Sequence, residues 1–141
     1  MGRDYLKIDA GGSLLPATAE TVTNKQHYVF QDGKTVFKWA VSNMADVSEQ
    51  IMNRNNLTNE SVDWLVPHQA NIRIIEAMAK KLNLPIERVA ITLNEQGNTS
   101  SASIPLALDK AIRDRLIKQG DLLMLEGFGG GLAWGSALIR Y

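Results

Sequence analysis

The chain has 141 residues, of which 45% are hydrophobic and 21% are charged. These values are typical of a globular domain and exclude a largely disordered chain. The 15 basic and 15 acidic residues cancel, which disfavours nucleic-acid binding, because such proteins usually carry a basic surplus. No apolar run reaches the roughly 18 residues of a membrane helix, and residues 1–7 contain no apolar signal region. We therefore expect a cytoplasmic protein.

The chain divides into a short first part and a longer second part. Residues 1–32 are expected to form an irregular lead-in, with short strands at 6–8 and 27–30. Residues 33–141 are expected to form the main domain, which begins with a long helix over about 34–55. The apolar positions that recur at helical spacing in this helix are Val36, Phe37, Ala40, Met44, Val47 and Ile51.

Helices and apolar strands alternate through the rest of the chain. A second helix is predicted to open with residues 67–71 and to end near Leu82, and a third has Pro105 in its first turn and ends at Gly120. This alternation predicts an α/β fold with a mostly parallel sheet and an antiparallel last strand. The predicted strands of this part are residues 64–66, 89–93, 122–125 and 132–141.

Three polar or glycine-rich segments follow predicted strands, namely residues 68–71, 97–99 and 127–131. Ligands of open α/β sheets gather at the carboxyl ends of the strands. We therefore expect these three segments to meet at one edge of the sheet and to form the functional site.

His68 lies between a predicted strand and a predicted helix. The positive end of a helix disfavours an imidazolium ion, so a neutral histidine in this place could donate a hydrogen bond to a developing oxyanion. The alternative is a histidine that caps the helix or packs under the loop.

Asn98 lies between Gly97 and Thr99 in a predicted strand-to-helix loop. Its carboxamide offers two N–H donors and never ionises, which suits stabilisation of a transition state. The alternative is an asparagine in a left-handed turn or at a helix cap.

The glycine run from Gly127 to Gly131 matches neither the dinucleotide-binding fingerprint nor a P-loop. It is expected to be a flexible loop whose backbone can approach a ligand closely, and the alternative is a tight hairpin between two strands. Cysteine is absent, which excludes disulfides, thiolate metal ligands and a cysteine nucleophile. The only histidines, His27 and His68, have no convincing ligand set around them, so no metal site is expected.

The second helix is expected to be amphipathic. Its core face is predicted to carry Ile72, Ile75, Ala79 and Leu82. Arg73, Lys80 and Lys81 lie on its polar side and could hold a phosphate or an acidic partner, although most such stripes are simply solvated helix faces.

Three motifs in this order resemble the carboxyl-terminal half of β-ketoacyl-acyl carrier protein synthase III. They are Val66-Pro67-His68-Gln69-Ala70-Asn71-Ile72-Arg73, then residues 97–103, then residues 127–136. The resemblance implies half of a thiolase-like fold, with helices packed on a mixed five-stranded sheet. It also implies decarboxylative condensation of acyl-coenzyme A with malonyl-acyl carrier protein, which initiates fatty acid synthesis. Both are substrates, and no resident cofactor is implied.

The resemblance also assigns roles to individual residues. His68 and Asn98 would donate hydrogen bonds to the malonyl thioester oxygen, and Gly130 would supply a backbone N–H to the oxyanion hole. Carrier-protein docking is implied for Lys38, Arg73, Lys80 and Lys81. Contact with coenzyme A or its pantetheine arm is implied for Gly33, Ala70, Asn71 and Phe128, the last beside the histidine.

The family's nucleophilic cysteine, which belongs to the amino-terminal half, is missing from this chain. We therefore expect a carboxyl-terminal half that is inactive alone and that pairs with an amino-terminal half, in a homodimer. Two alternatives remain, a non-catalytic module that binds acyl carrier protein or coenzyme A, and a pure assembly piece that self-associates through an exposed apolar surface.

Overall fold

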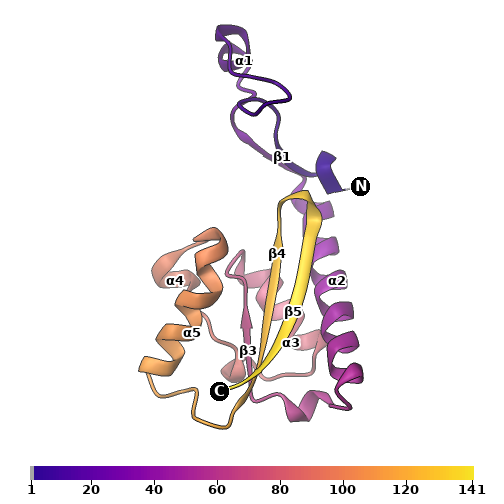
Figure 1. Ribbon diagram of the computed structural model, residues 1–141, viewed down its shortest axis with the longest axis vertical. Helices are drawn as coiled ribbons and strands as arrows, with labels where there is room; N and C mark the ends of the chain where they lie inside the picture. Colours follow the sequence, from indigo (N-terminus) through magenta and orange to yellow (C-terminus); the bar gives the residue numbers. More distant parts are fainter. Residues whose placement is uncertain (1) are drawn as a thin grey trace.

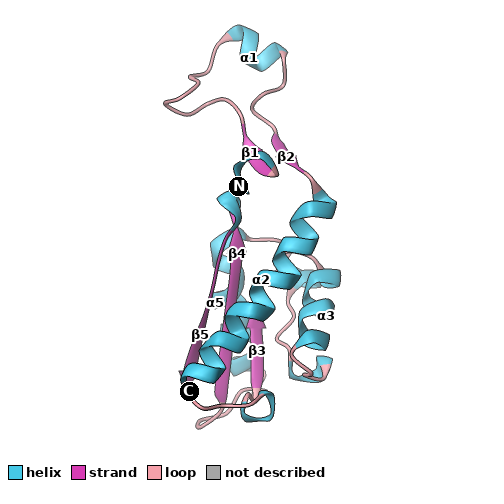
Figure 2. Ribbon diagram, turned by 90° about the vertical axis from the view of Figure 1, so that its right-hand side faces the viewer, coloured by secondary structure: helices cyan, strands magenta, loops and turns pink. Residues whose placement is uncertain are grey.

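A three-stranded sheet between two layers of helices forms the body of the molecule (Figures 1 and 2). The computed structural model describes residues 2–141. The helices are α1 (Ala19–Thr23), α2 (Gly33–Arg54), α3 (Ile72–Lys81), α4 (Leu93–Gln96) and α5 (Ser103–Arg113). The strands are β1 (Leu6–Ile8), β2 (Val29–Gln31), β3 (Trp64–Pro67), β4 (Leu122–Gly129) and β5 (Ala133–Arg140).

The sheet has the order β3-β4-β5, with β3 parallel and β5 antiparallel to the central strand β4. Leu65 lies opposite Met124, and Pro67 lies opposite Glu126. Strand β4 continues beyond the end of β3 and returns as β5 through a turn at Gly130–Leu132. The predicted α/β fold with a parallel pair and an antiparallel last strand is confirmed.

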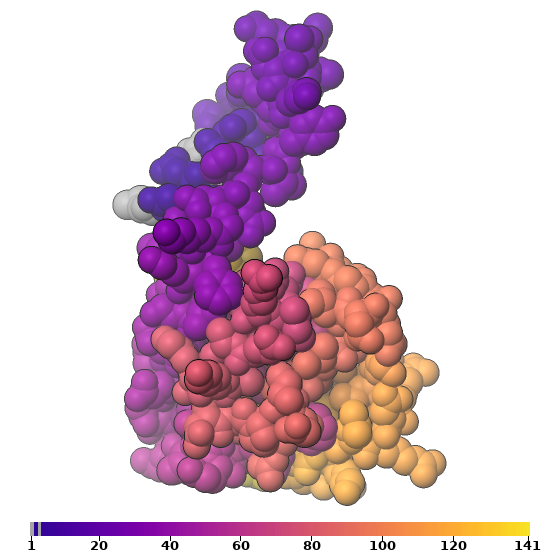
Figure 3. Space-filling view, turned by 180° about the vertical axis from the view of Figure 1, so that it is seen from behind, coloured from indigo at the N-terminus to yellow at the C-terminus, as the bar shows by residue number. Residues whose placement is uncertain are grey.

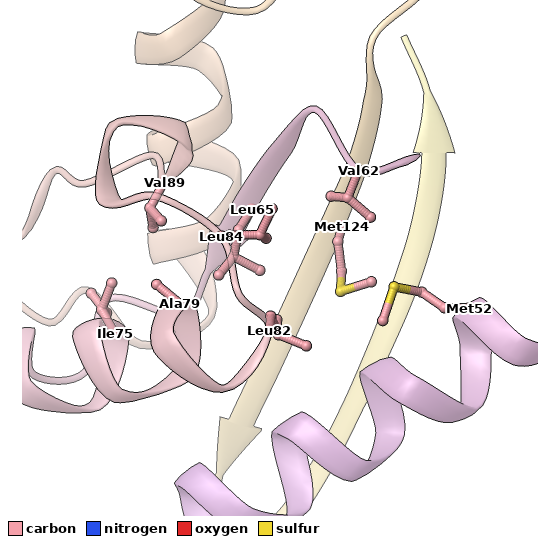
Figure 4. Close-up of a cluster of buried hydrophobic side chains, with 9 residues drawn as sticks. All are labelled: Met52, Val62, Leu65, Ile75, Ala79, Leu82, Leu84, Val89 and Met124. Atoms are coloured by element: carbon pink, nitrogen blue, oxygen red, sulfur yellow. The ribbon is translucent and has the colours of Figure 1, made fainter. Parts of the chain in front are cut away.

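Helices α2 and α3 cover one face of the sheet, and α5 covers the other face (Figure 1). The first layer is packed through the cluster drawn in Figure 4, where Met52 of α2 reaches toward Met124 of β4. On the other face, Ala107 and Ala111 of α5 pack against Leu123 of β4. Small residues on α5 let the helix lie close to the sheet, so both faces of β4 are buried.

Strand β5 is covered on one face only. Trp134 makes an edge-to-face contact with Trp39 of α2, with the ring centroids 5.9 Å apart, and Leu138 joins the core on the same side. The alternate residues of β5 point to the side of α5 but are exposed, because α5 lies over β3 and β4. These exposed residues are Ala133, Gly135, Ala137 and Ile139.

Residues 2–31 project from the body as an arm (Figure 3). The two short strands that the sequence predicted at 6–8 and 27–30 are β1 and β2, and they pair antiparallel, with α1 at the far end of the arm (Figure 2). Thr18 and Thr21 form a capping box at the start of α1. The arm exposes several large apolar side chains, namely Ile8, Leu14, Val22, Tyr28 and Val29. The predicted division of the chain at residue 33 stays a prediction.

The predicted five-stranded sheet has fewer strands in the described part of the chain. Strands β1 and β2 form a sheet of their own. The strand predicted over residues 89–93 is reduced to one bridge between Val89 and Leu65, and the chain enters α4 at Leu93. The physical reason lies at Pro67, which has no N–H to continue the ladder. The side chain of Gln69 fills the gap.

Gln69 is fully buried and bonds both neighbours of the interrupted ladder. Its Nε2 donates to the carbonyl of Pro67 at 2.8 Å and to that of Ala90 at 3.0 Å. Its Oε1 accepts from the backbone N–H of Thr92 at 2.9 Å. The side-chain amide of Gln69 therefore takes the place of two backbone hydrogen bonds between neighbouring strands.

Three smaller expectations were also wrong. Helix α5 ends at Arg113, well before Gly120, because the backbone turns at Asp114 and Arg115, and Arg115 has a positive φ of 58°. Gly127 and Gly129 belong to β4, so the glycine run is a strand and a turn, the alternative that the sequence left open. On α3, Ile74 is buried and Ile72 is 40% exposed, since Ile72 is the first residue of the helix and lies outside the contact with α2.

No helix among residues 2–141 combines the length and apolarity that crossing a membrane requires.

Candidate active site

His68 comes directly after β3, at the carboxyl edge of the sheet. Its backbone N–H donates to the carbonyl of Glu126 on β4 at 2.7 Å, which fixes the loop to the neighbouring strand. The imidazole is half-buried, and this burial lowers its pKa below the ordinary value. A lowered pKa favours the neutral imidazole at physiological pH.

The Nδ1 atom of His68 lies 2.6 Å from the Oγ atom of Ser103, the first residue of α5. The same Oγ accepts the backbone N–H of Gln69 at 3.2 Å. Ser103 is 1% exposed, so this contact is shielded from water. The start of α5 is thereby joined to the loop between β3 and α3.

Asn98 lies in the loop between α4 and α5, five residues before Ser103 in the chain. Gly97, which precedes it, has a positive φ of 66° and turns the chain at the end of α4. The Oδ1 atom of Asn98 accepts the backbone N–H of Ser100 at 3.0 Å, and the side chain is exposed. Its Nδ2 has no hydrogen-bond partner within residues 2–141, so both amide hydrogens are available to a ligand.

The structure places His68 and the loop of Asn98 at the same end of the sheet, since Ser103 joins them. No hydrogen bond links the two side chains directly in the described part of the chain. They are two separate hydrogen-bond donors that the fold brings to the same end of the sheet.

Gly130 begins the turn between β4 and β5 and is exposed. Pro67 lies opposite Glu126, so His68 is level with Gly127 on β4, and Gly130 is three residues further along the chain. At the usual rise of a strand this separates their backbones by roughly 10 Å along the strand direction.

Two of the residues implied to contact the pantetheine arm lie together, and two do not. Ala70 and Phe128 pack against the same cluster between α2 and α3. Asn71 is the N-cap of α3, where its Oδ1 accepts the N–H of Arg73 at 2.8 Å. Gly33 is exposed at the start of α2, next to the N-terminal arm of residues 2–31.

The basic residues implied for carrier-protein docking are all exposed. Arg73, Lys80 and Lys81 lie on α3, and Lys38 lies on α2, the helix packed beside it. No ion pair within residues 2–141 involves these four side chains. Their charges are therefore free to meet an acidic surface.

The sequence reasoning missed Ser103, Ser48 and Glu126. Glu126 is fully buried, and burial raises its pKa to about 8. Its carboxyl is hydrogen-bonded to the Ser48 hydroxyl on α2, on the face of the sheet opposite α5. A single charged residue after the apolar run Leu122–Leu125 was a signal that could have pointed to it. A serine at a helix start gives no comparable signal.

The arrangement offers neutral hydrogen-bond donors. No cluster of side chains able to hold a metal ion occurs within the described residues. A fixed imidazole and a carboxamide can stabilise negative charge that develops on an oxygen atom. Formation of a covalent intermediate needs a nucleophile in addition, and cysteine is absent from the chain.

This three-layer body, with its donors at the carboxyl edge of a mixed sheet, is the C-terminal half of a thiolase-like fold. Residues 52–141, more than half of the chain, match the family described as 3-Oxoacyl-[acyl-carrier-protein (ACP)] synthase III C terminal. The chain belongs to this family, as the sequence motifs predicted.

Similar proteins cover most or all of this chain. A beta-ketoacyl-[acyl-carrier-protein] synthase III of Porphyromonas gingivalis is 45% identical over 100% of this chain and 42% of its own length. One from Alkalilimnicola ehrlichii is 59% identical over 81% of this chain and 35% of its own length. The solved structure of the Pseudomonas aeruginosa PAO1 synthase III has a TM-score of 0.84 at 40% identity, covering 99% of this chain and 40% of that one. The chain thus spans less than half the length of these relatives.

Proposed function

We propose that this chain supplies the decarboxylation site of a 3-oxoacyl-[acyl-carrier-protein] synthase III. The protein would condense acyl-coenzyme A with malonyl-acyl carrier protein, and no resident cofactor is part of this proposal. The observation that carries it is the neutral imidazole of His68, held by α5 beside the loop of Asn98, in a chain of this family. A cytoplasmic location is part of the same proposal.

In the proposed reaction, the Nε2–H of His68 and an Nδ2–H of Asn98 donate to the thioester oxygen of the malonyl group. The bond between the carboxylate and the neighbouring carbon breaks, carbon dioxide leaves, and the electron pair moves onto the thioester oxygen as an enolate. Hydrogen bonds from neutral donors to the thioester oxygen strengthen as negative charge develops on it. They therefore stabilise the transition state more than the bound substrate, which lowers the barrier.

The enolate carbon then attacks an acyl group held as a thioester on a cysteine, and the thiolate leaves. Because this chain contains no cysteine, the nucleophile would come from the remainder of a complete synthase. The backbone N–H of Gly130 is proposed to donate to the oxyanion formed in this second step.

The rest of the synthase would also cover the bare face of β5. Ala133, Ala137 and Ile139 form an exposed apolar row beside α5. The arm exposes further apolar side chains. These surfaces support assembly with the other half of a synthase, in a homodimer.

The carrier protein and coenzyme A would approach the end of the sheet where His68 lies. Lys38, Arg73, Lys80 and Lys81 are proposed to bind the acidic carrier protein. Ala70 and Phe128 are proposed to line the path of the pantetheine arm, with Asn71 and Gly33 further out.

Coexpression of this chain with the cysteine-bearing half of the Porphyromonas gingivalis relative tests the proposal. Malonyl-coenzyme A decarboxylation is measured for the wild-type chain and for His68→Ala and Asn98→Ala. Each substitution removes one donor to the developing charge, so the rate should fall by about 10²–10³. His27→Ala in the arm is the matched control and should keep the wild-type rate. Full activity of both site variants would contradict the proposal.

A further inference from the structure

The buried hydroxyl of Ser103 has two hydrogen-bond partners within residues 2–141. One is Nδ1 of His68 at 2.6 Å, and the other is the backbone N–H of Gln69 at 3.2 Å. With 1% of the residue exposed, bulk water does not reach the hydroxyl. Its hydrogen bonds therefore have to be satisfied by these two groups.

The direction of the bond to His68 follows from the number of hydrogens. A serine hydroxyl has one hydrogen to donate and two lone pairs that accept. The N–H of Gln69 can only donate, so it uses a lone pair of Oγ. If Nδ1 of His68 also donated, the hydroxyl hydrogen would be buried without an acceptor, which costs roughly 1–3 kcal/mol. If the hydroxyl donates to Nδ1, all three groups are satisfied.

The second arrangement leaves the imidazole proton on Nε2. It also disfavours the imidazolium ion, since that form carries a hydrogen on Nδ1 and would turn the hydroxyl hydrogen away. The position of Ser103 at the start of the 11-residue helix α5 acts in the same direction, because the helix N-terminus is positive. Geometry and helix orientation thus favour one neutral form of the ring.

We propose that Ser103 is a positioning residue that holds His68 as the neutral tautomer with its proton on Nε2. Its catalytic consequence rests on the proposed function above. In this tautomer Nε2 donates to the thioester oxygen as negative charge develops. In the other tautomer Nε2 would present a lone pair to that charge and repel it, so loss of Ser103 should lower kcat more than it raises KM.

Nitrogen NMR of the chain labelled with ¹⁵N-histidine tests this directly. The sequence has only two histidines, and His27 lies in the arm, where its Nε2 is 2.8 Å from the hydroxyl of Thr21. His27 therefore provides an internal reference signal that Ser103 does not contact. For the wild-type chain we expect His68 to show a protonated Nε2 and an unprotonated Nδ1.

Ser103→Ala should increase the fraction with the proton on Nδ1 and raise the proton affinity of His68 by roughly three- to tenfold, the effect of one hydrogen bond. Ser103→Thr keeps the hydroxyl and should retain the wild-type signals. Ser101→Ala, an exposed serine of the same loop, is the matched control.

A wild-type spectrum with the proton on Nδ1 would overturn the proposal, even if Ser103→Ala fails to fold. Identical tautomer fractions and proton affinities in the wild-type chain and in Ser103→Ala would overturn it as well. The spectra need no activity, so the outcome is separate from that of the proposed function. If the tautomer is as expected and the reconstituted enzyme does not decarboxylate, the proposed function fails and the role of Ser103 toward the ring stands.

Discussion

The side-chain amide of Gln69 takes the place in the sheet that Pro67 leaves empty. In a regular parallel ladder, the N–H of residue 67 would reach the carbonyl of Ala90, and its carbonyl would accept from Thr92. Pro67 has no N–H, and Gln69 supplies both connections from its side chain. The residue after the candidate catalytic histidine thus holds the edge of the sheet together.

Gln69→Leu should destabilise the fold by at least about 3 kcal/mol, because it leaves three buried backbone groups without partners at roughly 1–3 kcal/mol each. Urea denaturation measures this loss. Gln50→Leu, on the exposed side of α2, should change stability little. Hydrogen exchange at the Thr92 amide should become faster in Gln69→Leu before the rest of the sheet changes. A loss below about 1 kcal/mol would show that backbone pairing can replace the side chain.

Glu126 gives the stability of the chain a defined pH dependence. Burial raises the pKa of this carboxyl in the folded chain from its ordinary value of 4.5 to about 8. Between these values the folded state binds the extra proton, so stability falls as pH rises, by at most about 1.4 kcal/mol per pH unit. The contribution is fully present below pH 4.5 and lost above about 8.

Glu126→Gln keeps a neutral polar group and should remove this part of the slope, which urea denaturation from pH 5 to 9 measures. The exposed Glu87→Gln is the control and should retain the wild-type slope. Ser48 bonds both the carbonyl of Met44 and the carboxyl of Glu126, and one hydroxyl hydrogen cannot serve both. The protonated carboxyl supplies the second hydrogen. Equal slopes in wild type and Glu126→Gln would refute a protonated Glu126.

Trp39 and Trp134 join α2 to the outer strand, and their edge-to-face contact should be measurable as a coupling. Trp39→Leu and Trp134→Leu, singly and together, form a double-mutant cycle in urea denaturation. We expect a coupling of about 0.5–1.5 kcal/mol. Additive effects of the two substitutions would mean that the rings contribute only by their burial.

Charge reversal on α3 tests the proposed docking surface. Arg73→Glu with Lys80→Glu should weaken binding of acyl carrier protein about tenfold at low salt and reduce the salt dependence. Lys118→Glu, an exposed lysine outside that surface in the loop before β4, makes a change of the same sign and should bind as wild type does. Calorimetric titration at low and high salt measures both. Equal affinities of the doubly reversed chain and wild type would place the carrier protein elsewhere.

The strongly patterned elements were predictable from the sequence. The helix predicted over 34–55 is α2 at Gly33–Arg54. The helix predicted to open with residues 67–71 and to end near Leu82 is α3 at Ile72–Lys81. Their apolar positions recur over several turns, so a local signal is enough. Helix α1 was missed because its five residues are too short for a periodic pattern and its capping box of two threonines is an unusual one.

The strand expected at residues 89–93 failed for a different reason. Its sequence suits a strand, but whether it can pair depends on the residue opposite, and Pro67 precedes it by more than twenty residues. The site shows the same limit. The position of His68 followed from its place after a strand, whereas its contact with Ser103, 35 residues away, depends on how α5 packs. Local patterns carry no information on such pairings.

Strand β5 is eight residues long and is an edge strand of the sheet. Its outer backbone groups and the row of Ala133, Ala137 and Ile139 face in directions that no helix of the body covers. A long exposed edge strand can pair with a strand of another molecule, which is the first step of aggregation. Handling the polypeptide in isolation will therefore call for dilute conditions, and a lysine introduced at position 137 should keep it dispersed without disturbing His68.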